Sequence, residues 1–298
     1  MSKHMLKLCV PLLVAVAVAG CGAGVPTIRV GSKNFTESFL MAEMYSLLLE
    51  NAGFKVERKF NLGGTPVAQA ALVKGEIDLY PEYTSTGLLT VLKEKPLTDP
   101  KAIVDAVRAG YRERFNLAWL DPAPFNDTQA LATTKAVADR YGLGTFSDLA
   151  AKAGELRLGG PPEFAERADG IKGLQKAYGG FEFKEFRQLG TGNLRYDALE
   201  HGDVDVVVAF GTDGQINGLG LVLLRDDRHF YPVYQAAPVV REDVLKKYPA
   251  IATALDKLAP LLTNGVMAGL NWQVDGPDKK AYAAVAETFL REKGLLKK

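Results

Sequence analysis

The chain has 298 residues, of which 47% are hydrophobic, and its 36 Lys and Arg residues nearly balance 35 Asp and Glu residues. A body this close to neutral argues against nucleic-acid binding, which requires a basic face, and against electrostatic docking to a membrane surface. The length is sufficient for two lobes of ordinary domain size.

The N-terminus has the pattern of a lipoprotein signal peptide. Lys3 and Lys7 precede a short apolar run, Leu8–Ala19, which is too short to span a bilayer as a helix. The run ends in V-A-G-C, a lipobox, which predicts cleavage after residue 20 and lipidation of Cys21. The alternative is simple secretory cleavage. A lipid on Cys21 would tether the body to a membrane face at the cell envelope.

The remaining reactive residues do not indicate catalysis. With Cys9 lost in the signal peptide, Cys21 alone remains, which excludes a disulfide, a thiolate metal site and a Cys nucleophile. His201 and His229 have no second His or Cys nearby, so we expect no metal site. Motifs for nucleotide binding, zinc proteases and serine hydrolases are absent from the sequence, and nothing marks a nucleophile. We therefore predict no catalytic residue, no cofactor and no enzymatic activity.

The first predicted lobe starts with a strand at Thr27–Val30. Thr36 or Ser32 is expected to cap the helix that follows, with Glu37 in its first turn. Thr65 and Pro66 form an N-cap and N1 pair that opens a second helix, which ends at Gly75. The other elements predicted here are strands at 54–60, 77–80 and 116–120 and a helix that opens at Thr84.

The second predicted lobe starts near Ala130. Its predicted helices are 147–153, 171–178 and 194–201, and its strands are 156–158, 181–186, 204–210 and 221–224. A polar-aromatic segment then crosses back to a strand at 238–240, and the predicted C-terminal helices are 242–248, 251–262, 266–272 and 279–293. The predicted division is therefore a signal peptide at 1–20, lobe I at 21–129 and 235–298, and lobe II at 130–234. Two crossings form a hinge that can open and close over a ligand.

A short pattern occurs in both predicted lobes. A-L-V-K-G-E-I-D-L at Ala71–Leu79 returns as A-L-E-H-G-D-V-D-V at Ala198–Val206, and each copy has an aromatic residue at the same later position, Tyr83 and Phe210. Each copy is typical of a helix, a Gly stop and a strand. Because ligands of open α/β sheets bind beyond the strand ends, the two aromatics predict a cleft between similar lobes. Chance similarity of common α/β patterns is the alternative.

Five further motifs resemble a single family across essentially the whole mature chain. They are G-S-K-N-F-T-E-S-F-L-M-A-E at 31–43, G-E-I-D-L-Y-P-E-Y-T-S-T-G at 75–87, E-F-A-E-R-A-D-G at 163–170, F-G-T-D-G at 210–214 and F-Y-P-V-Y-Q-A-A-P-V-V-R at 230–241. The family is the substrate-binding proteins of osmoprotectant ABC importers, which bind quaternary amines such as glycine betaine, choline, carnitine and proline betaine. The resemblance implies an α/β, type II periplasmic-binding-protein fold. It also implies a receptor at the extracytoplasmic or periplasmic face that delivers its solute to an ABC permease and its ATPase.

The resemblance also implies the site residues. It places an aromatic cage for the trimethylammonium head at Tyr83, Gln129, Phe210 and Tyr234. It places contacts to the solute carboxylate at Lys33 (through its backbone), Thr86 and Arg167. A quaternary ammonium has no N–H to donate, so aromatic faces are its natural recognition element, and an Arg fork suits a carboxylate.

Two cage positions depart from the family pattern. Gln129 stands where the family usually has Tyr in F-N-N-T-Y, and Phe210 stands in place of a Tyr. The amide at 129 removes one aromatic wall, which weakens a site for a simple betaine or indicates a solute that hydrogen-bonds Gln129.

Alternative interpretations remain open from the sequence. Tyr83 and Phe210 could be ordinary core aromatics, and Arg167 could form a surface ion pair with Glu163 or Glu166. The same receptor could bind another zwitterion, ergothioneine-like or amino-acid-like, or could serve as a sensory binding protein. An enzyme on a related two-lobe scaffold is the third possibility.

Overall fold

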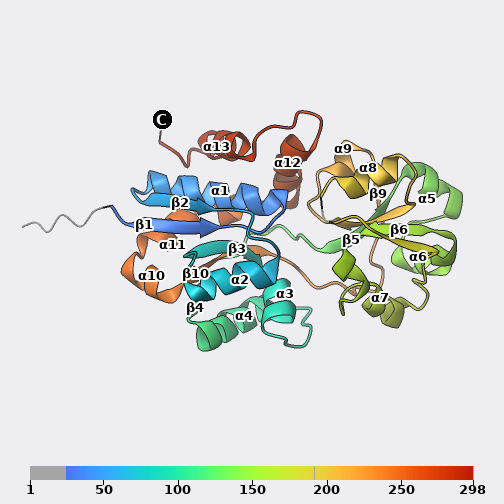
Figure 1. Cartoon of the computed structure of the whole chain (residues 1–298), viewed down its shortest axis with the longest axis horizontal. Coiled ribbons are helices and arrows are strands. Elements are labelled where there is room, and N and C mark those ends of the chain that lie inside the picture. Colours follow the sequence, from blue (N-terminus) through green and yellow to red (C-terminus); the bar gives the residue numbers. More distant parts are fainter. Residues whose placement is uncertain (1–24, 191, 298) are drawn as a thin grey trace, which may run out of the picture.

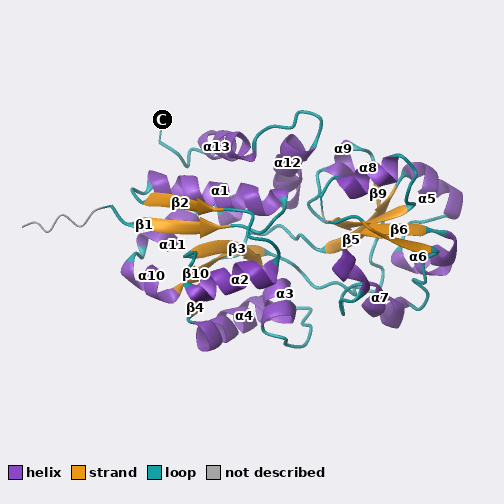
Figure 2. Cartoon of the chain, viewed as in Figure 1, coloured by secondary structure: helices purple, strands orange, loops and turns teal. Residues whose placement is uncertain are grey.

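The computed structural model describes residues 25–190 and 192–297, so the predicted signal peptide and Cys21 lie outside the described residues. Two five-stranded sheets, each covered by helices, form two lobes side by side (Figures 1 and 2). The strand orders are β2-β1-β3-β10-β4 and β7-β6-β8-β5-β9. Each sheet is mixed, because β10 runs antiparallel to β3 and β4, and β5 runs antiparallel to β8 and β9. The predicted two-lobe α/β fold is confirmed.

The elements of the first lobe come from both ends of the chain. Its strands are β1 (Thr27–Gly31), β2 (Lys55–Lys59), β3 (Leu79–Tyr83), β4 (Leu117–Trp119) and β10 (Ala236–Arg241). Its helices are α1 (Thr36–Asn51), α2 (Thr65–Lys74), α3 (Thr84–Thr86), a π-helical turn (Gly87–Val91), α4 (Pro100–Phe115), α10 (Glu242–Lys247), α11 (Ala250–Leu255), a 3₁₀ turn (Ala259–Leu261), α12 (Asn264–Asp275) and α13 (Tyr282–Glu292).

The second lobe is one continuous segment. Its strands are β5 (Gln129–Thr133), β6 (Arg157–Gly160), β7 (Glu185–Gln188), β8 (Val206–Phe210) and β9 (Val222–Leu223). Its helices are α5 (Lys135–Tyr141), α6 (Phe146–Lys152), α7 (Ile171–Tyr178), α8 (Leu194–Glu200) and α9 (Gln215–Gly218), with 3₁₀ turns at Ala153–Glu155 and Pro162–Ala165. Residues 120–128 and 224–235 connect the two sheets. The lobe boundaries 129/130 and 234/235 stay predictions, and they fall close to the ends of these segments.

The repeat in the sequence is a repeat in the structure. In each lobe a helix (α2 or α8) is followed by a Gly with positive φ, +72° at Gly75 and +71° at Gly202, and then by a strand (β3 or β8). Glycine adopts this left-handed conformation without the Cβ clash that other residues meet. The two strands begin at Leu79 and Val206 and end at Tyr83 and Phe210.

Some local predictions were wrong because tertiary partners take the expected capping groups. Phe35 is the N-cap of α1 and makes no side-chain cap. Ser32 Oγ instead accepts from the backbone N–H of Asn61, and the Thr36 hydroxyl donates to Asp275 Oδ1 at 2.7 Å. The N-cap of α2 is Gly64 rather than Thr65.

Other boundaries moved for packing or backbone reasons, and some elements were missed. Strand β7 starts at residue 185 and not at 181, because Phe181 has a φ of +56° and is fully buried in the core of the second lobe. The helix expected at 251–262 ends at Leu255, and Pro260 cannot continue it. The sequence analysis also missed α4, α5, α9 and β5.

The lobes touch each other beside the connecting segments. Helix α12 of the first lobe lies next to α9 of the second (Figure 1). There the half-buried Trp272 packs directly against Gly214 and Gly218, where an added Cβ would lie 2.6 Å and 2.3 Å from tryptophan atoms. Trp272 is therefore part of an interlobe contact.

Candidate functional site

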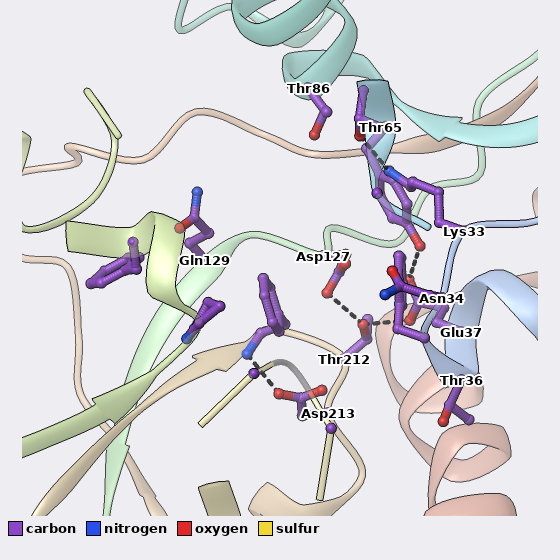
Figure 3. A pocket seen from close by; sticks show the side chains of 18 of the residues that line it. Lys33, Asn34, Thr36, Glu37, Thr65, Thr86, Asp127, Gln129, Thr212 and Asp213 are labelled. Carbon is purple, nitrogen blue, oxygen red and sulfur yellow. Dashed lines mark hydrogen bonds between the residues drawn. The ribbon is translucent and has the colours of Figure 1, made fainter. Parts of the chain in front are cut away.

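A cleft of about 740 Å³ lies between the lobes, and both lobes contribute its walls (Figure 3). The seven residues predicted to contact the ligand all line this cleft: Lys33, Tyr83, Thr86, Gln129, Arg167, Phe210 and Tyr234. Tyr83 and Phe210 are there because β3 and β8 end at the cleft, and Gln129 because β5 starts there. Their role in binding a ligand stays a prediction.

Asp169 joins three of these residues. Its carboxylate accepts hydrogen bonds from Arg167 Nε (2.7 Å) and a terminal guanidinium nitrogen (2.5 Å), Gln129 Nε2 (2.6 Å) and the Tyr234 hydroxyl (2.9 Å). Burial acts to raise the pKa of Asp169, but the Arg167 guanidinium more than compensates, so the pKa lies below its ordinary value. In this structure the Arg167 fork holds Asp169, and neither Glu163 nor Glu166 pairs with it.

Lys33 forms a second internal ion pair. Its ammonium lies 2.7 Å from Oε1 of the fully buried Glu82 and 3.2 Å from the Thr65 hydroxyl, and it sits 4.6 Å above the centre of the Tyr83 ring. The backbone N–H of Lys33 donates to Ser38 Oγ at 2.8 Å. The contact expected through this N–H would therefore have to replace an existing hydrogen bond.

Glu37 lies at the centre of a buried network between the lobes. Its carboxylate accepts from the Tyr83 hydroxyl (2.8 Å), the Thr212 hydroxyl (2.5 Å) and Asn271 Nδ2 (2.9 Å). The Thr212 hydroxyl also lies 2.9 Å from Asp127 Oδ1 (Figure 3). Loss of hydration raises the pKa of both Glu37 and Asp127, for Asp127 well above its ordinary value.

Phe210 has a cation beside its ring. The guanidinium of the fully buried Arg195 lies 5.4 Å from the ring centre and donates to Asp213 Oδ2 at 2.6 Å. Asp213 also accepts from the backbone N–H of Phe210 at 2.8 Å, which holds the end of β8 in place. The ring therefore lines the cleft with its backbone fixed.

Several residues of the site were missed although they lie inside recognised motifs. Glu37, Asp127, Asp169, Thr212 and Asp213 all stand in or beside the segments that carried the resemblance. Their acidic or hydroxyl side chains next to predicted ligand contacts were the available signal. Asn271 and Asp275 lie on α12, outside the recognised motifs, and only the tertiary packing of α12 brings them to the cleft. The sequence therefore carried no such signal for them.

The arrangement suits the binding of a small organic cation or zwitterion. Three aromatic faces, Tyr83, Phe210 and Tyr234, share the cleft with the carboxyl groups of Glu37 and Asp127. Within the described ranges, no group of three His, Cys, Asp or Glu residues is placed to hold a metal ion. Nor does any helix of those ranges have the length and hydropathy needed to cross a membrane.

Comparison with known proteins identifies the family. The profile of the substrate-binding domain of ABC-type glycine betaine transport systems matches residues 26–292. The chain belongs to this family. Its members named below are binding proteins of transporters, so the interpretation that the chain is not an enzyme is confirmed.

Two relatives illustrate the range of the family. The chain is 39% identical over 267 residues to the ergothioneine transport permease/ergothioneine binding protein EgtU of Helicobacter pylori strain G27, covering 89% of this chain and 47% of that protein. The chain therefore spans about half the length of this relative. It is 35% identical over 274 residues to the carnitine transport binding protein OpuCC of Listeria monocytogenes, covering 91% of this chain and 88% of that protein.

A solved structure agrees with the fold. The crystal structure of a glycine betaine/carnitine/choline ABC transporter protein superimposes with a TM-score of 0.77 at 33% identity, covering 90% of this chain and 99% of the other. The family member is thus a substrate-binding protein with two α/β lobes, as its sequence motifs predicted.

Proposed function

We propose that this family member is the solute receptor of an ABC importer and that its cleft binds a zwitterionic quaternary amine. The observation that supports this most is the meeting of Tyr83, Phe210 and Tyr234 in one cleft with the carboxyl groups of Glu37 and Asp127. A trimethylammonium group cannot donate hydrogen bonds, and aromatic faces attract it by about 0.5–2 kcal/mol each. Whichever of the two carboxyl groups is ionised adds attraction for the same charge.

The proposal covers the path of the solute as well. An osmoprotectant such as glycine betaine would be captured at the extracytoplasmic face of the membrane and delivered to an ABC permease with its ATPase. A lipid at Cys21 would keep the receptor close to that permease. The test is acyl-chain mass on Cys21 in the mature protein purified from its host, with Cys21→Ser as control. If the wild-type protein lacks that mass increment, the lipid anchor is contradicted, and the proposal that the cleft binds a solute still stands.

One observation favours a second candidate solute, a betaine that carries a larger polar group. Gln129 replaces an aromatic wall, and the name of the H. pylori relative, at 39% identity, refers to ergothioneine. Ergothioneine is a trimethylammonium betaine with a polar ring, so it satisfies the same aromatic faces and offers groups that an amide can bind.

A thermal-shift and calorimetry screen of the mature protein tests both solutes. The panel contains glycine betaine, choline, carnitine, ergothioneine and amino acids without a quaternary nitrogen. A solute that binds only the native state must raise the melting temperature, by an amount that grows with its concentration. We expect at least one quaternary amine to bind and the unmethylated amino acids to fail. Binding of unmethylated amino acids alone would contradict the proposal.

A further inference from the structure

Gln129 is held at the cleft by a contact that orients its amide. Its Nε2 donates to Asp169 Oδ2 at 2.6 Å, and its side chain rises from the start of β5 at the cleft (Figure 3). An Asn or Gln amide has a donor end and an acceptor end, and the partner decides which end faces it. The orientation of this amide therefore depends on the state of Asp169.

Asp169 can only accept. Both of its oxygens are held by Arg167, Nε at 2.7 Å to Oδ1 and a terminal nitrogen at 2.5 Å to Oδ2, and this ion pair keeps the carboxyl ionised. The Tyr234 hydroxyl also donates to Oδ2. Every group that faces Asp169 is thus a donor, and the end of the Gln129 amide that faces it must be the NH₂.

The other end of the amide is then an oxygen. Gln129 is 5% exposed and lines the cleft, so what remains accessible of it is accessible from the cleft. Among the described residues, none donates a hydrogen bond to Gln129 Oε1. The cleft consequently presents a carbonyl acceptor at the position where the family usually has the face of a Tyr ring.

We infer that Gln129 Oε1, oriented by Asp169, selects quaternary-amine solutes that carry an N–H or O–H donor. The inference rests on the proposed function, because the trimethylammonium head has no donor and the selected group must belong to the rest of the solute. A solute without a donor leaves this oxygen unpaired in a dry site, which weakens binding by about 10- to 100-fold. Asp169 acts as a positioning residue, since its effect on the solute passes through Gln129.

Two matched pairs of betaines test the inference by calorimetry. Carnitine and γ-butyrobetaine differ by one hydroxyl group. Histidine betaine carries an imidazole ring with an N–H donor, and phenylalanine betaine carries a phenyl ring without one. We expect the donor-bearing member of at least one pair to bind the native protein at least about tenfold more tightly. Ratios within twofold for both pairs, with measurable binding, overturn the inference and leave the proposed function in place. No binding by any of the four contradicts the proposed function for this class of solute, and the inference falls with it.

Three variants assign the ratio to the amide. Gln129→Met keeps the length of the side chain without its polar atoms, and it should bring the ratio close to one while the donor-free betaine binds at least as well. Asp169→Asn puts a possible donor where the native carboxylate only accepts, so the amide can turn its oxygen toward residue 169 and the ratio should also fall. Gln188→Met, on the exposed end of β7 outside the cleft, is the control and should keep the native ratio. A native ratio that survives in Gln129→Met overturns the inference, and the ratio of the native protein decides the matter alone if a variant does not fold.

Discussion

The hydroxyl of Thr212, on the second lobe, lies 2.5 Å from a carboxylate oxygen of Glu37, on the first. The same hydroxyl lies 2.9 Å from Asp127 Oδ1, in a segment that connects the lobes. A hydroxyl has one hydrogen, so it cannot donate to both carboxylates at once. For both contacts to be hydrogen bonds, one of the carboxyl groups must carry a proton.

This proton predicts a pH dependence of stability. Burial raises the pKa values of Glu37 and Asp127. Between the ordinary and the raised pKa values, the native state therefore binds more protons than the unfolded state. Their contribution to stability is therefore complete below about pH 4, the ordinary range of carboxyl groups, and is lost as the pH rises through the raised values. Urea unfolding of the ligand-free protein from pH 4 to pH 8 measures it. Asp127→Asn should flatten this part of the profile, and an unchanged slope would contradict the assignment.

The ion pair between Lys33 and Glu82 predicts a large loss of stability on neutralising one partner. Glu82 is fully buried and its oxygen lies 2.7 Å from the Lys33 ammonium. Glu82→Gln leaves a buried charge without its counter-charge, which we expect to cost about 3–5 kcal/mol in the free energy of unfolding. Glu57→Gln, which removes an exposed pair with Lys59, is the matched control and should have little effect. Equal losses in the free energy of urea unfolding of the two variants would show that the buried pair contributes no more to stability than the exposed one.

Tyr234 is predicted to have two separable roles. The side chain is 3% exposed and packs in the core of the first lobe, while its hydroxyl donates to Asp169. Tyr234→Phe keeps the aromatic face and should lower stability by about 1.5–3 kcal/mol, the value of a hydrogen bond to a charged group. Tyr234→Ala removes the buried ring and should cost about 3–5 kcal/mol. Calorimetry should then show solute binding retained by the Phe variant and greatly weakened in the Ala variant. Loss of binding in the Phe variant would make the hydroxyl, and not the ring, the recognition element.

The contact between α9 and α12 predicts opposite effects for two glycines. A methyl group on Gly218 would lie 2.3 Å from the Trp272 ring, so Gly218→Ala should destabilise the protein by about 1–3 kcal/mol. On α12 itself, a methyl group on Gly269 meets nothing within 4 Å, and Gly269→Ala should stabilise the helix by about 0.5–1 kcal/mol. Chemical unfolding of both variants distinguishes the effects, and destabilisation of similar size in both would argue against a specific contact at Gly218.

The sequence predicted what depends on local pattern. The helix, Gly and strand units that end in Tyr83 and Phe210 repeat a local pattern, and the structure confirms them in both lobes. The contacts that orient the site join residues far apart in the chain, such as Glu37 and Thr212 or Asp169 and Tyr234. No local pattern specifies such partners, because they depend on how the two sheets are placed.

Thr65 shows how a local helix-capping pattern and a tertiary contact compete for one side chain. The sequence pattern predicts that its hydroxyl caps α2, yet Thr65 is the first residue of that helix, after the N-cap Gly64, and its hydroxyl accepts from the Lys33 ammonium at 3.2 Å. A hydrogen bond to a charged group is stronger than one to a backbone N–H, and so the tertiary partner takes the hydroxyl. The same reasoning applies to Arg167, whose carboxylate partner in this structure is Asp169 two residues along the chain.

The placement of the two tryptophans makes one of them an intrinsic fluorescence probe of lobe movement. Trp119 is buried in the core of the first lobe, whereas Trp272 is half-buried at the surface that α12 shares with α9 of the second. Any swing of the lobes that disturbs this surface changes the surroundings of one indole and leaves the other as a constant reference. Intrinsic fluorescence, with Trp272→Phe to isolate the Trp119 signal, therefore follows lobe movement during solute binding without an attached dye.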